Sequence, residues 1–260
     1  MAFLEDQQLL AACGSWRRAN TSCYQLSPGN PPSWQPMPPL GGQHCSWQAS
    51  TRSKYLEGLG WLLLGQDEQC LDGAMNIMTE LYTTDHEWID LPMASPYADG
   101  YPDSSCVVAV NSTTLFVCGG YNGHYQSSSW MLDLTDYSWI QLQDMPESRY
   151  GHACALTMDN NEILIAGGIY NGGDKSTVYI FDISNNSWRQ IGDLPSGFNY
   201  NGYIEILQWN NQHILLEYGT TNIWLSTNNG LSWERMEASM GAKNYGDVAV
   251  VVPMGLYQCQ

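Results

Sequence analysis

A tryptophan recurs about every 50 residues along this chain, and its surroundings are similar each time. A short apolar run that ends in glycine lies upstream of each copy, and a Leu-Pro or Met-Pro step follows four of them. A fixed period of this length indicates that one supersecondary unit is repeated several times. The tryptophans that mark the period are Trp34, Trp88, Trp139, Trp188 and Trp233.

The unit is clearest in residues 149–195. Two short apolar segments flank the turn-forming residues 159–161, and the second segment ends at Gly167 and Gly168, where we expect the backbone to need positive φ or close neighbours. A third, alternating segment follows a polar loop, and Trp188 opens the fourth. Four short antiparallel strands in about 50 residues are typical of one β-propeller blade.

Several of these residues resemble kelch repeats. They are Gly119-Gly120, Gly167-Gly168, Tyr179 with Trp188 after it, and Arg149-Tyr150-Gly151-His152. The resemblance extends over essentially the whole chain and is strongest in residues 97–195, although the second and fifth units lack the double glycine. It implies an all-β, kelch-type propeller whose usual role is protein–protein interaction, although the family also includes enzymes. The repeated tryptophans would then pack between adjacent blades.

The period predicts one domain, residues 1–260, with about five four-stranded blades. The expected blades are 1–39 plus 241–260, 40–93, 94–146, 147–195 and 196–240. The N-terminus reads as a second strand whose first strand is missing, and residues 247–252 read as a first strand that could close the ring. The alternative is a fragment of a six- or seven-bladed ring, and both readings stay open.

The net charge is −17, from nine basic and 26 acidic residues. Because phosphate groups are bound by Lys and Arg, nucleic acids and anionic membranes are unfavourable partners. No stretch reaches the roughly 20 apolar residues of a membrane-spanning helix. The N-terminus carries two acids and no leading basic residue, unlike a secretion signal.

Eight cysteines are present, and Cys106 and Cys118 fall opposite one another across an expected hairpin. This register would allow a disulfide between them. The alternative is that both are small buried apolar residues. There is no tight CxxC pair and no evident Cys/His constellation, so no metal is expected. Three glycosylation motifs begin at Asn20, Asn111 and Asn185, and with the cysteines they favour an extracellular location. The missing secretion signal favours a cytoplasmic one.

Candidate binding residues come from the loops after the glycines and the loops between blades. By the resemblance, both sets of loops belong to one face of the propeller. They are rich in Tyr and Arg, which dominate binding hot spots. The candidates are Arg17, Tyr121, His124, Tyr125, Arg149, Tyr150, Tyr170, Phe198, Tyr200 and Tyr245. The sequence therefore predicts a non-enzymatic module that binds a partner protein through an aromatic face, without a cofactor.

Other functions have weaker support. Carbohydrate binding is an alternative, because stacking tyrosines and Asn/Asp-rich loops suit sugars. Residues 226–233 resemble the Asp-box of sialidases, with Asn228 in place of the aspartate, but the arginines that would bind a substrate carboxylate are scattered. A galactose-oxidase-like enzyme would need histidine and tyrosine ligands, and the chain has only five histidines.

Overall fold

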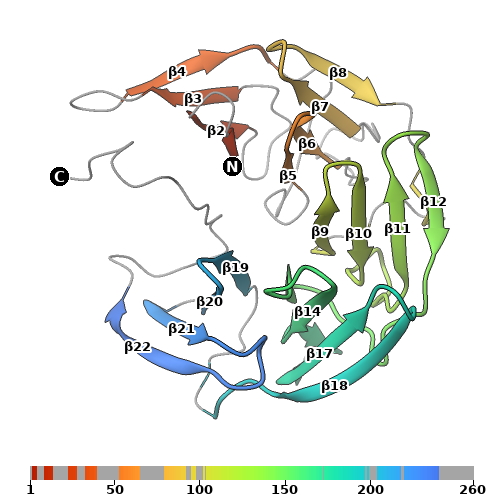
Figure 1. Cartoon of the computed structure of the whole chain (residues 1–260), viewed down its shortest axis with the longest axis vertical. Helices are drawn as coiled ribbons and strands as arrows, with labels where there is room; N and C mark the ends of the chain where they lie inside the picture. The colour runs from red at the N-terminus through yellow and green to blue at the C-terminus, as the bar shows by residue number, and fades with distance from the viewer. Residues whose placement is uncertain are drawn as a thin grey trace. The chain divides into compact units, whose positions relative to one another are not determined.

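The computed structural model describes residues 2–4, 9–13, 23–27, 33–39, 53–64, 79–91, 95–97, 102, 104–171, 173–196, 198, 204–217 and 220–239. All regular structure in these residues is β-strand (Figure 1). Accordingly, none of them forms a helix that could cross a membrane. The chain divides into two compact units, the first built mainly from Met1–Pro102 and the second mainly from Asp103–Val110 and Thr114–Ala249.

The first unit holds two four-stranded sheets, ordered β1-β2-β3-β4 and β5-β6-β7-β8. Neighbouring strands are antiparallel. The bounds are β1 Ala2–Leu4, β2 Leu9–Cys13, β3 Cys23–Ser27, β4 Ser33–Met37, β5 Ser53–Leu56, β6 Gly60–Leu63, β7 Thr79–Thr83 and β8 Trp88–Leu91.

One sequence-based expectation about the first sheet was wrong. Its first strand is not missing from the N-terminal segment, because β1 pairs with β2 and places Phe3 opposite Leu10. Residues 241–260, which were expected to supply that strand, lie outside the described residues. Ring closure and blade number stay predictions.

The second unit holds three four-stranded sheets and one small hairpin. The sheets run in the orders β9-β10-β11-β12, β13-β14-β17-β18 and β19-β20-β21-β22, and β15 pairs with β16. The bounds are β9 Cys106–Asn111, β10 Thr114–Cys118, β11 Ser129–Asp133, β12 Ser138–Gln141, β13 Ala153–Leu156, β14 Glu162–Ala166, β15 Ile169–Tyr170, β16 Gly173–Asp174, β17 Thr177–Asp182, β18 Ser187–Asp193, β19 Glu205–Trp209, β20 Gln212–Leu216, β21 Asn222–Ser226 and β22 Glu234–Ser239. Each four-stranded sheet has the strand order of a propeller blade, and the all-β propeller architecture predicted from the repeats is confirmed.

Short polar turns set where these strands begin and end. Between β17 and β18, the Asp182 carboxylate accepts hydrogen bonds from the Asn185 backbone and side chain and from the Ser184 hydroxyl. These bonds, first of all that from the Asn185 side chain, lower the pKa of Asp182 to about 2. Asn186 adopts a φ of 48°, a conformation that asparagine tolerates better than most residues. Such turns replace long loops and let four strands fit into one repeat.

The cores of the second unit lie between successive sheets. Phe116 of β10 and Phe181 of β17 are fully buried, and their ring centroids are 5.1 Å apart. The next cluster joins Leu164 of β14 to Leu215 of β20 and Trp224 of β21. Because the buried residues of one sheet pack on those of the next, neighbouring blades stabilise each other.

Two of the repeated indoles donate a hydrogen bond to the segment that follows the preceding sheet. Trp188 packs against Phe181 with ring centroids 4.9 Å apart, and its Nε1 donates to the Gln143 carbonyl at 2.8 Å. Trp88 likewise donates to the Pro38 carbonyl at 3.0 Å. Gln143 and Pro38 each lie four residues after the tryptophan of the preceding repeat.

The other three indoles differ in how far they are covered. Trp233 is buried in the core formed by the fourth and fifth sheets, and Trp139 is partly buried. Trp34 is 46 % exposed, so its predicted burial between blades is wrong within the described residues.

The double glycines adopt the backbone that the sequence predicted. Their φ values are +63° and +100° for Gly119 and Gly120, and +66° and +96° for Gly167 and Gly168. A Cβ at Gly168 would lie 2.8 Å from the His152 Cβ and 2.9 Å from the Tyr150 carbonyl oxygen. Only glycine therefore fits this turn without displacing the segment that leads into β13.

Candidate functional site

Four tyrosines of the second unit gather into what we term the tyrosine cluster: Tyr121, Tyr125, Tyr150 and Tyr170. Tyr125 lies at its centre, with ring centroids 5.3 Å from Tyr121, 5.7 Å from Tyr150 and 5.1 Å from Tyr170. Tyr121 and Tyr150 are 5.8 Å apart. Edge-to-face and tilted ring pairs at these separations attract each other beyond simple burial.

Backbone hydrogen bonds hold the segments that carry these rings. Tyr121 and Tyr125 form an isolated antiparallel bridge in the loop after β10, and Tyr150 exchanges both backbone hydrogen bonds with Ile169, at 3.1 and 2.9 Å. The Gln126 carbonyl also accepts a bond from the Arg149 backbone at 3.1 Å, which joins the loop to the segment before β13. The rings are therefore presented by a fixed scaffold.

The cluster has a solvent-facing side. Tyr121 is 41 % exposed and Tyr170 is 44 % exposed, whereas Tyr125 and Tyr150 are half-buried. The Lys175 ammonium lies 5.4 Å from the centroid of the Tyr170 ring, and His124 is exposed on the same loop as Tyr121. Five of the ten candidate residues thus lie in or next to one accessible group. Arg17, Tyr200 and Tyr245 lie outside the described residues.

Arg149 does not belong to that accessible surface, and its prediction as a contact residue was wrong. It is fully buried, and its guanidinium donates to the Gly167 carbonyl at 2.9 Å, the Thr177 hydroxyl at 2.7 Å and the Glu147 carboxylate at 2.9 Å. It also lies 5.0 Å from the centroid of the Tyr179 ring. Burial lowers the pKa of Arg149 and Glu147 opposes that change. Arg149 joins the turn after β14 to the start of β17.

Phe198 was also predicted as a contact residue, and it too is buried. It is 4 % exposed and its ring lies 5.9 Å from that of Trp224. The ring belongs to the apolar cluster that includes Leu164 of β14 and Leu215 of β20, where it is removed from water. Phe198 therefore contributes to packing between sheets.

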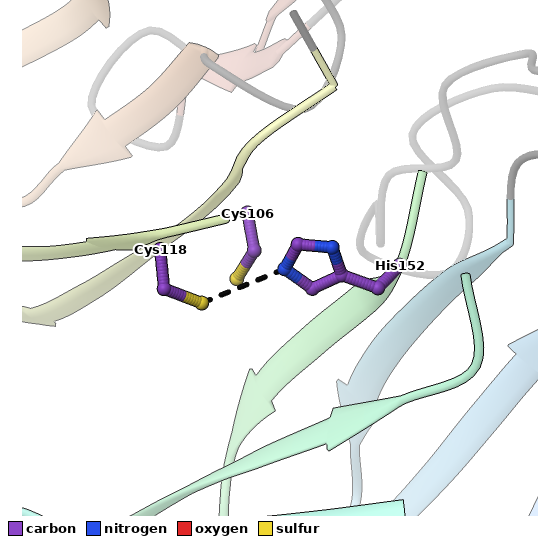
Figure 2. Close-up of side chains that lie close together, drawn as sticks. All are labelled: Cys106, Cys118 and His152. Atoms are coloured by element: carbon purple, nitrogen blue, oxygen red, sulfur yellow. Dashed lines mark hydrogen bonds between the residues drawn. The ribbon is translucent and has the colours of Figure 1, made fainter. Parts of the chain in front are cut away.

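A second group of reactive side chains lies beneath the surface. Cys118 Sγ lies 3.5 Å from His152 Nε2, and Cys106 Sγ is within 4.8 Å of both (Figure 2). All three residues are buried. The sequence indicated no Cys/His constellation because these residues are far apart along the chain: Cys106 lies in β9, Cys118 in β10, and His152 just before β13.

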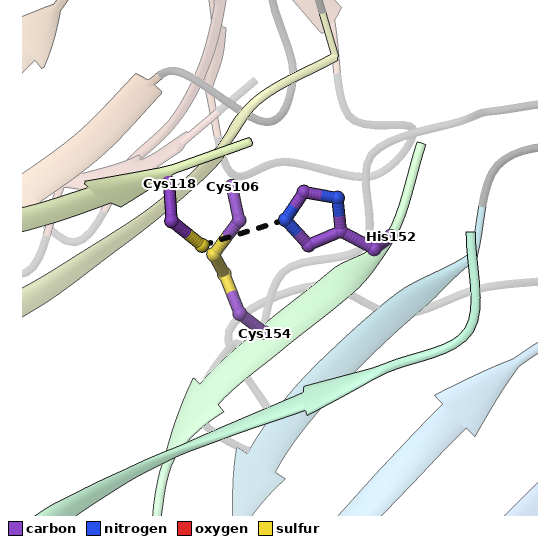
Figure 3. The surroundings of a disulfide bond; sticks show 4 residues. All are labelled: Cys106, Cys118, His152 and Cys154. Carbon is purple, nitrogen blue, oxygen red and sulfur yellow. Dashed lines mark hydrogen bonds between the residues drawn. A yellow bond between two sulfur atoms is a disulfide. The ribbon is translucent and has the colours of Figure 1, made fainter. Parts of the chain in front are cut away.

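Cys106 is joined by a disulfide to Cys154, not to Cys118, so the predicted pairing was wrong (Figure 3). Side chains project from the face of a sheet, and from β9 Cys106 meets Cys154 of β13 in the next sheet, with 6.0 Å between the Cα atoms. Among the described cysteines, Cys118 is the free thiol.

The environment of this group keeps its members neutral. Burial, with a smaller contribution from the Arg149 charge, lowers the pKa of His152 to about 3. Burial also raises the pKa of the Cys118 thiol far above its ordinary value. His152 therefore remains an unprotonated imidazole at neutral pH, with a lone pair on one ring nitrogen.

Two of the three glycosylation motifs lie in exposed hairpin turns. Asn111 is exposed at the end of β9, and Asn185 is exposed between β17 and β18. The Asn111 side-chain oxygen accepts a bond from the Thr113 backbone at 2.9 Å, and the Asn185 amide donates to Asp182 at 2.7 Å. Asn20 lies outside the described residues, and glycan attachment stays a prediction.

The Asp-box-like segment has a local structural role. The Asn228 side-chain oxygen accepts a bond from the Ser232 backbone at 3.0 Å, and its amide donates to the Ser232 hydroxyl at 2.8 Å. These bonds close the turn between β21 and β22. In this segment, which resembles the Asp-box of sialidases, Asn228 therefore shapes a hairpin turn.

Comparison with known proteins identifies one family. The family model described as the KLHDC2/KLHL20/DRC7 Kelch-repeats domain matches residues 61–242, which is more than half of the chain. A search of curated proteins found no match.

Proposed function

Because the chain belongs to the kelch-repeat family, we propose that it is a non-enzymatic module that binds another protein through the tyrosine cluster. Members of this family generally serve as protein-interaction scaffolds. The observation that carries the proposal is the grouping of four tyrosines, two of them exposed, on loops fixed by backbone hydrogen bonds.

The physical properties of the cluster support this role. A tyrosine gives a large, stiff contact area with only two side-chain torsions to restrict, and its hydroxyl can still hydrogen-bond at the rim of an interface. Because the rings already pack on one another, little side-chain entropy remains to be lost on binding. Rigid aromatic groups of this kind are frequent hot spots.

Replacing the two exposed rings tests the proposal. The double variant Tyr121→Ala/Tyr170→Ala should weaken partner binding by about 2 kcal/mol or more, which is roughly thirtyfold. Its free energy of unfolding should change by less than about 1 kcal/mol, because exposed side chains contribute little to stability. Affinity capture with quantitative mass spectrometry would identify proteins retained by wild type, and titration would give the affinity ratio.

The matched control is Ile140→Ala/Leu231→Ala, which removes two side chains of the second unit that are each 60 % exposed, both outside the tyrosine cluster. This control should retain the captured protein. If both double variants bind every captured protein as wild type does, the proposal fails. A glycan array tests the alternative of carbohydrate binding. A glycan that wild type binds and the Tyr121→Ala/Tyr170→Ala variant does not bind would show that the ligand of the cluster is a carbohydrate and not a protein.

A further inference from the structure

We propose that Cys106, Cys118, Cys154 and His152 form a buried binding site for a soft divalent cation such as Zn²⁺ when the disulfide between Cys106 and Cys154 is reduced. The four side chains converge from two neighbouring sheets of the second unit (Figure 3). This proposal is independent of the proposed binding role of the tyrosine cluster.

The spacing of the ligand atoms suits a tetrahedral metal. Zinc binds thiolate sulfur at about 2.3 Å and imidazole nitrogen at about 2.0–2.1 Å, which places neighbouring ligand atoms roughly 3.5–3.8 Å apart. Cys118 Sγ and His152 Nε2 already lie 3.5 Å apart, and Cys106 Sγ lies within 4.8 Å of both (Figure 2). Cys154 Sγ is bonded to Cys106 Sγ, so reduction of the disulfide leaves a fourth candidate ligand beside the other three (Figure 3).

The ligand types and the local charge also match. Three cysteines and one histidine are a common set for structural zinc, and soft sulfur ligands select Zn²⁺ over Mg²⁺ or Ca²⁺. A divalent cation with three thiolates carries a net charge of −1, and Arg149, a buried cation, lies on the same segment as His152, which packs against Gly119 beside Cys118.

The disulfide and the metal are mutually exclusive. A dithiol reductant would transfer two electrons and two protons to the Cys106–Cys154 bond, giving two thiols while the reductant becomes a disulfide. Zn²⁺ then displaces the thiol protons as it binds. Either linkage ties β9 to β13, so the two sheets stay crosslinked in an oxidising environment by the disulfide and in a reducing one by the metal.

Metal titration of the reduced protein tests the site. The full chain is reduced anaerobically, freed of metal with a chelator, and titrated with Co²⁺ as a spectroscopic substitute for Zn²⁺. Wild type should bind one more equivalent than Cys118→Ser and Cys118→Ala, with the ligand-field absorption of tetrahedral cobalt and a thiolate charge-transfer band. Zn²⁺ should displace the Co²⁺ and protect Cys106, Cys118 and Cys154 from alkylation, as read by peptide mass spectrometry.

Two controls separate this site from other metal-binding groups. His124→Ala removes an exposed histidine outside the group and should retain the extra equivalent, whereas oxidised wild type should lack it. Circular dichroism follows the fold during reduction, and Zn²⁺ should raise the thermal midpoint of reduced wild type but not of Cys118→Ser. Equal metal content and equal alkylation of Cys118 with and without Zn²⁺ would overturn the proposal, as would a midpoint that Zn²⁺ leaves unchanged.

Discussion

Replacement of Arg149 by leucine is expected to lower the free energy of unfolding of the second unit by about 3 kcal/mol. Leucine removes the guanidinium that bonds the Gly167 carbonyl, the Thr177 hydroxyl and the Glu147 carboxylate. A buried acceptor left without a donor costs about 1–3 kcal/mol. Glu147 is 35 % exposed, so water can partly replace its lost partner, which places the effect at the lower end of the range for broken buried pairs.

Two matched variants separate burial from charge in this prediction. Arg189→Leu also removes an arginine bonded to a carboxylate, that of Glu162, but Arg189 is 51 % exposed and should cost less than about 1 kcal/mol. Arg149→Lys keeps the charge but cannot reach several acceptors at once, and we expect an intermediate loss. Urea unfolding followed by tryptophan fluorescence measures all three, and equal midpoints for Arg149→Leu and Arg189→Leu would show that this account of Arg149 is wrong.

The second large effect is expected at Gly119, where alanine should cost about 3 kcal/mol. Its φ of +63° costs a non-glycine residue roughly 1–2 kcal/mol. An added Cβ would also lie 2.5 Å from His152 Cε1 and 2.7 Å from the Arg149 carbonyl oxygen. That carbonyl accepts a 2.8 Å bond from the Gly120 backbone, so it cannot move away without breaking the contact between sheets. Overpacking of this kind adds a further loss of about 1–3 kcal/mol.

Gly123 is a control, because it also has a positive φ but no atoms lie close to the position of an added Cβ. Its φ is +89°, and nothing lies within 4 Å of an added Cβ. Gly123→Ala should therefore show only the conformational cost, about 1–2 kcal/mol. Thermal unfolding of both variants gives the difference directly. Equal losses would mean that packing against His152 and Arg149 does not hold Gly119 in place.

Much of the fold follows from the repeat itself. β14 lies between the predicted turn at residues 159–161 and the predicted glycines Gly167 and Gly168, because a polar turn precedes it and a positive-φ glycine follows it. The proximity of Tyr121 and Tyr170 could also be predicted from the sequence. Tyr121 follows Gly119-Gly120 and Tyr170 follows Gly167-Gly168 at nearly the same distance. Residues at equivalent places in neighbouring repeats come close together when the repeats stack side by side.

What the sequence did not predict depends on contacts between repeats. Counting along a hairpin pairs Cys106 with Cys118, whereas the disulfide crosses to Cys154 in the next sheet. Arg149 was predicted as a contact residue because it lies in a loop between blades and arginine is frequent in binding hot spots. Two of the partners that bury it, Gly167 and Thr177, lie 18 and 28 residues away. β1 has only three residues, which is too short for an alternating pattern to reveal.

Site-specific photo-crosslinking tests the central claim, that the tyrosine cluster is the binding surface, most directly. A photoreactive phenylalanine analogue is placed at Tyr121, at Tyr170 or at Ile140 of β12, which is more exposed than either tyrosine, and each protein is mixed with the partner obtained by affinity capture. The account predicts crosslinks to the partner from positions 121 and 170 and none from position 140. Crosslinks from position 140 with none from positions 121 and 170, in a complex that remains intact, would contradict it.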